Sequence, residues 1–434
     1  MNKPRILYIS SANPLKGPGT IALSNYHALK EEGFDVDLLT LYPVEGYPEF
    51  IYVKQGISII DKLKNRLKSI IYPKPLKGYH FFYRKENQPP VSTKRVLAKI
   101  SKQYDLVMVL FWQGMLSFET IEAIYDKLHC LFFFLGVDYS QMSGGCHFVG
   151  DCTRYQIGCG KCPAFNSQDE NDFTHWNVEY RKKVYEKVKP IVWGNHYMID
   201  FYKKSYLLKN ARLELATPAV DSETFHPVDK SYLRTKYQIP IDKQFIIAFG
   251  CQHLADKRKG IDYLIEALKL FNNNISAEER KHIMTLSIGS EFDLIKDQIP
   301  FETKHLGVIP VNILSDFYSL ADIFVCPSVD DAGPTMVNQS LSCGTPVVGF
   351  EMGAVIESVK DKNTGYCAKL RDSIDLCKGI ESFFSMKEIE RKQVSGKCRD
   401  VVVNDYSYEN KIYNSWMRVY DCYSKSSDLN CRPH

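Results

Sequence analysis

The sequence contains no apolar run long enough to cross a membrane, and its start, MNKPRILYISS, has no hydrophobic segment of signal-peptide length. Charge of one sign is also scarce, because 55 Lys and Arg face 51 Asp and Glu, which gives a net charge of +4. Nothing in this balance favours nucleic acid as a partner. No short-period repeat or low-complexity segment is present. These absences predict a cytoplasmic globular protein, and 434 residues suit two large domains.

Thirteen cysteines, an odd number scattered over a large chain, favour reduced thiols over a secreted disulfide framework. Four of them lie close together in the sequence: Cys146, Cys152, Cys159 and Cys162. The last two form a Cys-x2-Cys knuckle, and four thiolates can hold one structural, tetrahedral Zn²⁺. Two local disulfides or plain buried thiols are the alternatives. A catalytic metal is not expected, since no Asp-x-Asp stands at a strand end after a helix.

Residues 327–350, PSVDDAGPTMVNQSLSCGTPVVGF, organise the chain. Short apolar runs at Ile323–Cys326 and Val347–Phe350 predict buried strands. Between them Pro334–Cys343 has helical spacing, with Pro334 suited to the first helical position. The stretch therefore predicts a strand–loop–helix–strand unit.

The start of this helix predicts a ligand site. The loop Asp331-Ala332-Gly333 leads into it, and the N–H groups and positive dipole end of a helix attract an anion. Thr335 and Gln339 are four residues apart and share one helix face. A carboxylate, an anion-binding turn and an amide suit a ligand that carries hydroxyls and a phosphate.

This stretch resembles the nucleotide-sugar motif of family-4 retaining glycosyltransferases with the GT-B fold. That motif has Glu, seven residues, Glu and a small-residue turn; here Asp331 and Gln339 stand at the two Glu positions, and Cys-Gly-Thr-Pro follows. The resemblance implies that Asp331 holds hydroxyls of the donor sugar and that Gln339 holds the ribose. It implies that the turn of Ala332, Gly333, Pro334 and Thr335 holds the diphosphate and sugar. An ordinary βαβ unit with a capped helix is the plain alternative.

A second part of the resemblance lies at Phe245–Gly250, an expected strand, and Ile261–Phe271, an expected helix. Between them Lys259 and Gly260 resemble the family's Lys-Gly pair. The resemblance implies that Lys259, helped by Arg258, clamps the donor diphosphate. The family's Arg just after the strand is replaced by Cys251. A solvated basic loop is the alternative interpretation.

The first half of the chain opens like a Rossmann domain, with a strand at Arg5–Ser10 and a helix at Thr20–Glu32. The loop between them carries Gly17 and Gly19 on either side of Pro18. It resembles the glycine loop that the family places near the donor diphosphate, because glycine lets the backbone approach a phosphate. A plain Gly-Pro-Gly turn is an equally good interpretation.

A later loop follows Leu131–Leu135, a strongly apolar run that predicts a central parallel strand. Gly136-Val137-Asp138 and then SGGCH resemble a subset of the family that has His-Asp and Thr-Gly-Gly-Cys-His. Val137 replaces the His. We expect Asp138 to bind an acceptor hydroxyl or to orient the loop, unless it only bonds nearby backbone N–H groups.

Residues 61–85 form a basic insertion with eight Lys or Arg between residues 62 and 85 and no acid. A basic amphipathic element with aromatics suits an anionic membrane surface or a lipid-linked diphosphate acceptor. A solvated insertion that packs its apolar residues on the domain is the alternative.

The expected fold class is α/β, a GT-B pair of Rossmann-like domains with parallel sheets that face a cleft. Residues 1–222 form the acceptor domain with the cysteine loop 144–163, residues 223–404 form the donor domain, and residues 405–434 form a crossover helix and tail.

The expected reaction moves a sugar with retention from a UDP- or GDP-type donor to a saccharide or lipid-linked acceptor, with no cofactor required for catalysis. Asp138, Asp331 and Lys259 are the expected catalytic residues. The expected setting is surface polysaccharide or glycolipid assembly, in the cytoplasm or at the inner membrane face. A nucleotide-sugar epimerase and a sugar-nucleotide-binding pseudo-transferase are the rival functions.

Overall fold

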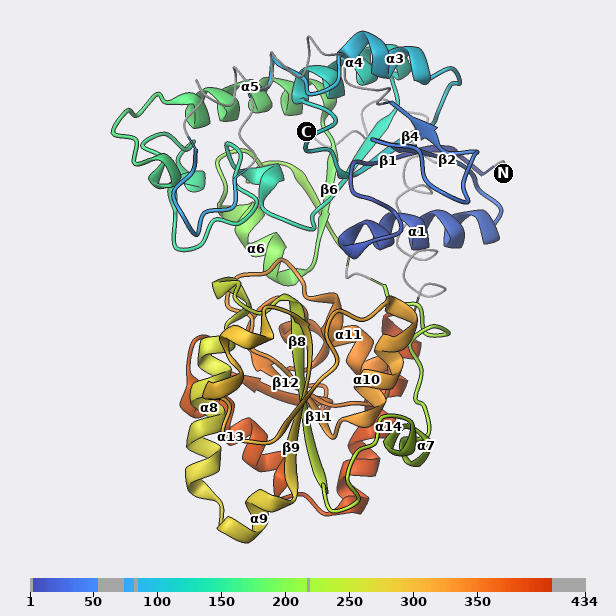
Figure 1. Cartoon of the computed structure of the whole chain (residues 1–434). Coiled ribbons are helices and arrows are strands. Elements are labelled where there is room, and N and C mark those ends of the chain that lie inside the picture. Colours follow the sequence, from blue (N-terminus) through green and yellow to red (C-terminus); the bar gives the residue numbers. More distant parts are fainter. Residues whose placement is uncertain (1–2, 54–73, 82–84, 217–218, 408–434) are drawn as a thin grey trace. The chain divides into compact units, whose positions relative to one another are not determined.

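The computed structural model describes residues 3–53, 74–81, 85–216 and 219–407 (Figure 1). They form two compact units. The first consists of the described residues up to Gly194 together with Met198–Ala216, and the second of residues 219–407 together with Asn195–Tyr197. Most of the basic insertion 61–85 and the crossover helix expected within 405–434 lie outside the described residues, so both stay predictions.

The first unit contains a seven-stranded sheet in the order β3-β2-β1-β4-β5-β6-β7, and all of its neighbouring strands run parallel. The central strand β4 reads LVMVLF and is buried at every position, as a parallel sheet covered on both faces requires. The strands are β1 (Arg5–Ser10), β2 (Asp35–Thr40), β3 (Ile51–Tyr52), β4 (Leu106–Phe111), β5 (Leu131–Leu135), β6 (Ile191–Gly194) and β7 (Arg212–Leu215).

Helices and short 3₁₀ turns connect these strands. Asp172 starts the long helix α5, because its carboxylate accepts hydrogen bonds from the first-turn N–H groups of Thr174 and His175. The helices are α1 (Thr20–Glu31), α3 (Thr93–Lys99), α4 (Phe118–Leu128), α5 (Phe173–Val188) and α6 (His196–Lys204). The 3₁₀ turns are η1 (Gly17–Gly19), η2 (Ser140–Met142), η3 (Arg154–Gln156) and η4 (Pro163–Phe165).

The second unit contains a six-stranded sheet in the order β10-β9-β8-β11-β12-β13, again parallel throughout. Its strands are β8 (Phe245–His253), β9 (Ile283–Ser290), β10 (Thr303–His305), β11 (Ile323–Cys326), β12 (Val347–Phe350) and β13 (Gly365–Ala368). Its helices are α7 (Lys230–Lys236), α8 (Ile261–Asn274), α9 (Ala277–Lys281), α10 (Leu314–Leu320), α11 (Thr335–Ser342), α12 (Ala354–Ser358), α13 (Ser373–Phe384) and α14 (Glu388–Asp405). The 3₁₀ turns are η5 (Lys257–Lys259), η6 (Phe292–Leu294), η7 (Lys296–Gln298) and η8 (Val311–Ile313).

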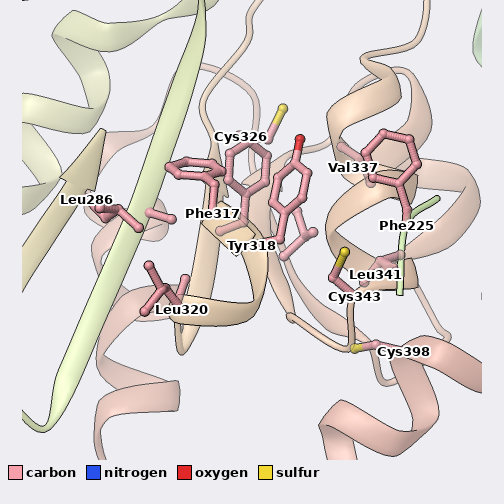
Figure 2. Packing of buried hydrophobic residues seen from close by; sticks show 14 of the residues in the cluster. Phe225, Leu286, Phe317, Tyr318, Leu320, Cys326, Val337, Leu341, Cys343 and Cys398 are labelled. Atoms are coloured by element: carbon pink, nitrogen blue, oxygen red, sulfur yellow. The ribbon is translucent and has the colours of Figure 1, made fainter. Parts of the chain in front are cut away.

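Alternate residues of the central strands in this sheet enter different cores, as the period of two in a strand requires. In β8, Ile246 and Ala248 join the cluster formed with α10, α11 and α14. Phe245, Ile247 and Phe249 join the opposite cluster, formed with α8 and α13. Figure 2 shows the first cluster from close by. The sheet is therefore covered by helices on both faces, as in a doubly wound α/β domain.

Several sequence-based boundaries are confirmed: β1, β5, β11 and β12 span the residues that their apolar runs predict. One detail is wrong. Pro334 is not the first helical residue but the N-cap of α11, with φ −64° and ψ 109°, so its backbone is still extended. The α/β fold of two parallel-sheet units agrees with the expectation.

Candidate functional site

The order of the strands in the second sheet predicts a ligand site between two of its loops. The chain runs outward from β8 through β9 to β10, then restarts at β11 beside β8 and runs the other way through β12 to β13. At such a switch point, the loops after the two central strands diverge and leave a crevice at the carboxyl end of the sheet. The loop after β8 carries Arg258 and Lys259, and the loop after β11 carries Asp331, Ala332 and Gly333.

Lys259 and Asp331 meet at this position. The Nζ of Lys259 lies 2.5 Å from Oδ2 of Asp331, although the two residues are far apart in the sequence. The other oxygen, Oδ1, accepts a hydrogen bond from the backbone N–H of Gly333 at 3.2 Å. The two side chains are 24% and 14% exposed, so both still reach the surface of the unit. The structure therefore brings together the three groups that the sequence predicts at the phosphate and the sugar.

The charges of this pair stabilise each other. Burial opposes the charged form of Asp331, but the ammonium of Lys259 and the N–H of Gly333 outweigh it and lower the pKa of the carboxyl. Burial likewise opposes the charge of Lys259, and the carboxylate of Asp331 reverses that effect and raises the pKa of the ammonium. Both groups are therefore ionised at neutral pH.

Gly260 fixes how closely the two loops approach. Its φ is +65°, which favours glycine, and a Cβ built there would lie 1.9 Å from the carbonyl oxygen of Pro327. The backbone of Arg258 continues the contact, because its carbonyl accepts a hydrogen bond from Val329 N–H at 2.8 Å. The Lys-Gly pair of the sequence is thus needed for packing as well as for charge.

Arg258 is held within its own loop. Its Nη2 donates to Oδ2 of Asp256 at 2.5 Å, and its backbone N–H donates to Oδ1 of the same carboxylate at 3.1 Å. Asp256 also caps the turn η5, which carries both basic residues. Lys259 therefore pairs with a carboxylate of the loop after β11, Asp331, whereas Arg258 pairs with Asp256 in its own loop.

The turn that leads into α11 is compact. Ala332 and Pro334 are buried, whereas Gly333 and Thr335 are partly exposed at the start of the helix. Gly353, in the loop after β12, packs against this turn: its φ is +50°, and a Cβ there would lie 3.0 Å from Cδ of Pro334. The loops after β8 and β12, on either side of the loop after β11, thus pack against it at the carboxyl edge.

Gln339 lies one helical turn beyond Thr335, as predicted, but its amide has a partner that the sequence does not reveal. The Oε1 of Gln339 accepts a hydrogen bond of 3.1 Å from the hydroxyl of Tyr318. Tyr318 is fully buried in the cluster of Figure 2, beside Phe317 and facing the helix that carries Val337. Tyr318 uses one of the two lone pairs of this oxygen, so the NH₂ and the second lone pair of Gln339 remain for a ligand.

In the first unit, Gly17 and Gly19 follow β1, which lies next to β4 at the switch point of that sheet. Gly17 has φ +52° with open space around its Cβ position, whereas a Cβ at Gly19 would lie 2.0 Å from the carbonyl oxygen of Asn13. Gly19 is thus required for packing inside the loop itself. A role of either glycine at a phosphate stays a prediction.

Asp138 follows β5 and is almost completely buried, with a side chain 1% exposed. One oxygen accepts a hydrogen bond from Ser140 N–H at 2.7 Å, and the other lies 2.9 Å from Nδ1 of His147, whose side chain is 29% exposed. Asp138 therefore orients its own loop and the imidazole of His147. Contact with an acceptor stays a prediction, and in this arrangement His147 reaches further out than Asp138.

The cysteine loop gathers its four thiols around one cavity, which Cys146, Cys152, Cys159 and Cys162 line together with Phe81 and Val149. None of the cysteines in the described residues forms a disulfide. Burial raises the pKa of Cys159 to about 12 and that of Cys162 to about 11, so both carry a proton at neutral pH. No group of three or more His, Cys, Asp or Glu in the described part of the chain is arranged to hold a metal ion.

A family model covers the segment in which the Lys259–Asp331 pair lies. Residues 233–399 match the model of glycosyl transferases group 1. This group 1 segment runs from α7 into α14 and includes every loop of the site in the second unit.

Individual relatives of the group 1 segment are distant. A D-inositol 3-phosphate glycosyltransferase of Geodermatophilus obscurus is 23% identical over 190 residues, which are 41% of this chain and 41% of that protein. An uncharacterised glycosyltransferase of Haemophilus influenzae is 26% identical over 171 residues, 37% of this chain and 45% of that protein. The chain thus matches less than half the length of these curated relatives.

Solved structures extend the likeness to the whole chain. A sucrose-phosphate synthase of Thermosynechococcus elongatus aligns with a TM-score of 0.69 at 17% identity, over 98% of this chain and 100% of that one. HepE of Anabaena, in complex with UDP and glucose, aligns with a TM-score of 0.62 at 12% identity, over 96% and 99%. At such identities the likeness shows the fold, which is the GT-B arrangement of two parallel-sheet α/β domains.

Sequence reasoning missed two partners of the functional loops. Tyr318 precedes the group 1 motif on α10, and Arg181 on α5 supports the loop after β5 by donating to the carbonyl oxygens of Ser140 and Ser143. Glu86 neutralises Arg181 inside the unit, where both side chains are about 5% exposed. No local pattern reveals these contacts, since each joins residues distant in sequence.

Proposed function

We propose that the chain is a retaining glycosyltransferase that moves a sugar from a nucleoside-diphosphate sugar to an acceptor hydroxyl. The observation that carries this proposal is the Lys259–Asp331 pair at the switch point of the second sheet, inside the segment that matches group 1 glycosyl transferases. A cation, a carboxylate and a helix start converge there. HepE, which is similar to this chain in fold, was solved in complex with UDP and glucose, and this supports a nucleoside diphosphate as the ligand we propose here.

Lys259 supplies the positive charge that the leaving group needs. A diphosphate that binds its ammonium takes over part of the contact with Asp331. The carboxylate is then able to accept from the hydroxyls of the transferred sugar. Because the pair is largely buried, its charges interact more strongly than exposed charges in water do. Such fixed charges stabilise the diphosphate as it departs without costly reorganisation.

The reaction balances without a protein base. The bond between the anomeric carbon and the diphosphate oxygen breaks, and a bond between that carbon and the acceptor oxygen forms on the same face. The proton of the acceptor hydroxyl passes to the departing diphosphate. The protein then contributes positioning and charge neutralisation, which suits a site whose cation, carboxylate and helix start are held by packed glycines.

The acceptor side belongs to the first unit in this proposal. Asp138 fixes the loop after β5, and His147 is the more exposed member of the pair. Acceptors of the saccharide or lipid-linked class fit the proposed reaction, with surface polysaccharide or glycolipid assembly as its setting. No helix in the described residues is both long and apolar enough to span a bilayer. For a peripheral membrane contact we propose the basic insertion, because its eight Lys and Arg suit an anionic surface.

Calorimetry with UDP and GDP tests the donor site. We expect one of them to bind wild-type protein, and Lys259→Ala to bind it about tenfold or more weakly, since a hydrogen bond to a charged group contributes about 1.5–3 kcal/mol. Lys269→Ala, which removes an exposed lysine from α8, is the control and should bind as wild type does. Equal affinity of Lys259→Ala and wild type would show that the loop after β8 does not hold the diphosphate.

Product analysis tests the reaction itself. Incubation with the bound donor and a panel of glycan acceptors should consume the donor and give a glycoside with the anomeric configuration of the donor, as read by NMR. Binding of the nucleotide without transfer to any acceptor would favour a pseudo-transferase. Conversion of the donor to an epimer without an acceptor would favour the epimerase.

A further inference from the structure

The cysteine loop is long and has little regular structure, yet it is held firmly. Between β5 and α5 the chain forms only the 3₁₀ turns η2, η3 and η4. Two glycines make close backbone approaches: a Cβ at Gly144 would lie 2.3 Å from the carbonyl oxygen of Thr174, and one at Gly160 would lie 1.9 Å from that of Glu170. Such a segment cannot form a large apolar core of its own, so an additional cross-link has a clear structural use.

All four thiols of this loop face one small space, which we call the thiol cavity. It is lined by Cys146, Cys152, Cys159 and Cys162, with Phe81, Val149 and Ala164 around them. The lining also includes Tyr79, Thr174 and Arg154 but no carboxylate or imidazole, so the four sulfurs are its strongest ligands for a metal ion. Four sulfur ligands and no carboxylate favour a soft, tetrahedral ion over Mg²⁺ or Ca²⁺.

In the knuckle Cys159-Gly160-Lys161-Cys162 the backbone makes a tight turn, and nearby backbone groups hydrogen-bond the cysteine sulfurs. Cys159 has φ +60°, Gly160 +77° and Lys161 +40°, which is a costly run for residues other than glycine. Backbone groups near the turn point toward the sulfurs of Cys159 and Cys162. Gly144 N–H donates to Sγ of Cys159 at 3.3 Å, and the backbone of Ala164 hydrogen-bonds Cys162. Donors aimed at two sulfurs are what a ligated, negatively charged sulfur requires.

We propose that the four cysteines of the thiol cavity bind one Zn²⁺, which cross-links the loop 144–163 of the first unit. In the described residues the thiols do not stand in a ligating arrangement, so binding has to draw them together. Rotation about χ1 moves a cysteine sulfur between staggered positions without moving the backbone. Four protein ligands leave no open coordination position, so the ion is structural and takes no part in sugar transfer. The proposal is independent of the donor site, which lies in the other unit.

Metal analysis of the full-length protein, purified under reducing conditions, tests this proposal. We expect about one Zn per chain, and uptake of Co²⁺ by metal-stripped protein with the intense absorption of tetrahedral cobalt thiolate. Cys159→Ser with Cys162→Ser should abolish both. The control is Cys367→Ser, a partly exposed cysteine in β13 of the second unit, which should retain both.

Three results would overturn the proposal, and none requires the double variant to fold. The first is wild-type protein that contains no zinc and takes up no Co²⁺ while all thirteen cysteines react as free thiols after denaturation. The second is wild-type protein in which the thiols of the cavity are found as two disulfides. The third is a visible iron–sulfur absorption, which would identify a different cluster on the same ligands.

Discussion

Replacing Gln339 separates its structural role from its role toward a ligand. In Gln339→Ala the hydroxyl of Tyr318 loses the acceptor that lies 3.1 Å away, while the ring stays buried in the apolar cluster of Figure 2. A buried polar group without a partner costs about 1–3 kcal/mol. For a unit of this size that corresponds to a fall in melting temperature of roughly 2–12 °C. Calorimetry should find this fall in the transition of the second unit.

A double-mutant cycle isolates the contact. Tyr318→Phe removes the hydroxyl and leaves the partly exposed Gln339 accessible to water, so its cost should be small. Once the hydroxyl is gone, Gln339→Ala no longer leaves it unsatisfied. The double variant should therefore be more stable than the sum of the single changes predicts, by about 1 kcal/mol or more. Additive effects would show that the Tyr318–Gln339 bond contributes nothing to stability.

Nucleotide affinity gives the second half of the test. If the NH₂ of Gln339 holds the ribose, Gln339→Ala should weaken binding by up to about tenfold, since one such bond contributes on the order of 1 kcal/mol. Gln339→Glu should keep the fold, because a carboxylate also accepts from Tyr318, and should tighten binding by up to about tenfold through charge-assisted bonds to ribose hydroxyls. Gln339→Ala that loses stability but binds UDP or GDP as wild type does would refute the ribose assignment.

Two further predictions concern the loops around the ion pair. The pKa of Asp331 is lowered in the folded protein, so its contribution to stability is complete above its unfolded value of about 3.9 and is lost as pH falls through the lower folded value. Asp331→Asn should thus be less stable than wild type at neutral pH, and the difference in unfolding temperature should shrink below about pH 4; a constant difference would contradict the pair. Gly260→Ala should destabilise the second unit by at least about 1–3 kcal/mol, because its φ is +65° and its Cβ would meet Pro327. Gly396→Ala, in α14 with open space at its Cβ, is the matched control and should be neutral or stabilising by up to about 1 kcal/mol; equal effects in thermal unfolding would refute the close-approach argument.

Much of the second unit follows from local pattern. Apolar runs of four residues next to a Pro predict β11 and β12, since a strand covered on both faces has no polar side to interrupt the run. The spacing of Thr335 and Gln339 predicts a shared helix face. The small-residue turn before α11 indicates an anion site. These signals are short-range and made Asp331 a candidate, whereas the resemblance to the family's Lys-Gly pair made Lys259 one, before any contact between the two residues was known.

The contacts of Asp138 and of the four cysteines were harder to predict from the sequence. Asp138 reads in sequence as a turn residue or an acceptor ligand, and its actual partners are Ser140 N–H and the imidazole of His147. The cysteine spacing predicts a cluster, and the cavity unites the four thiols, but the spacing does not give the orientation of the sulfurs. These features depend on χ angles and on which loops the sheet brings together.

The sequence by itself determined several strands of both sheets and the small-residue turn before α11, because hydrophobic period and turn chemistry act over a few neighbouring residues. Its resemblance to a known family supplied the expected fold and the other residues of the donor site. Only the tertiary structure decided that Lys259 faces Asp331, that Tyr318 occupies the oxygen of Gln339, and that Arg181 supports the loop after β5. Each of these contacts joins residues on separate elements. The order of the strands in each sheet and the need of every buried polar atom for a hydrogen bond decide which residues meet in these contacts. Neither can be predicted from the local pattern of the sequence.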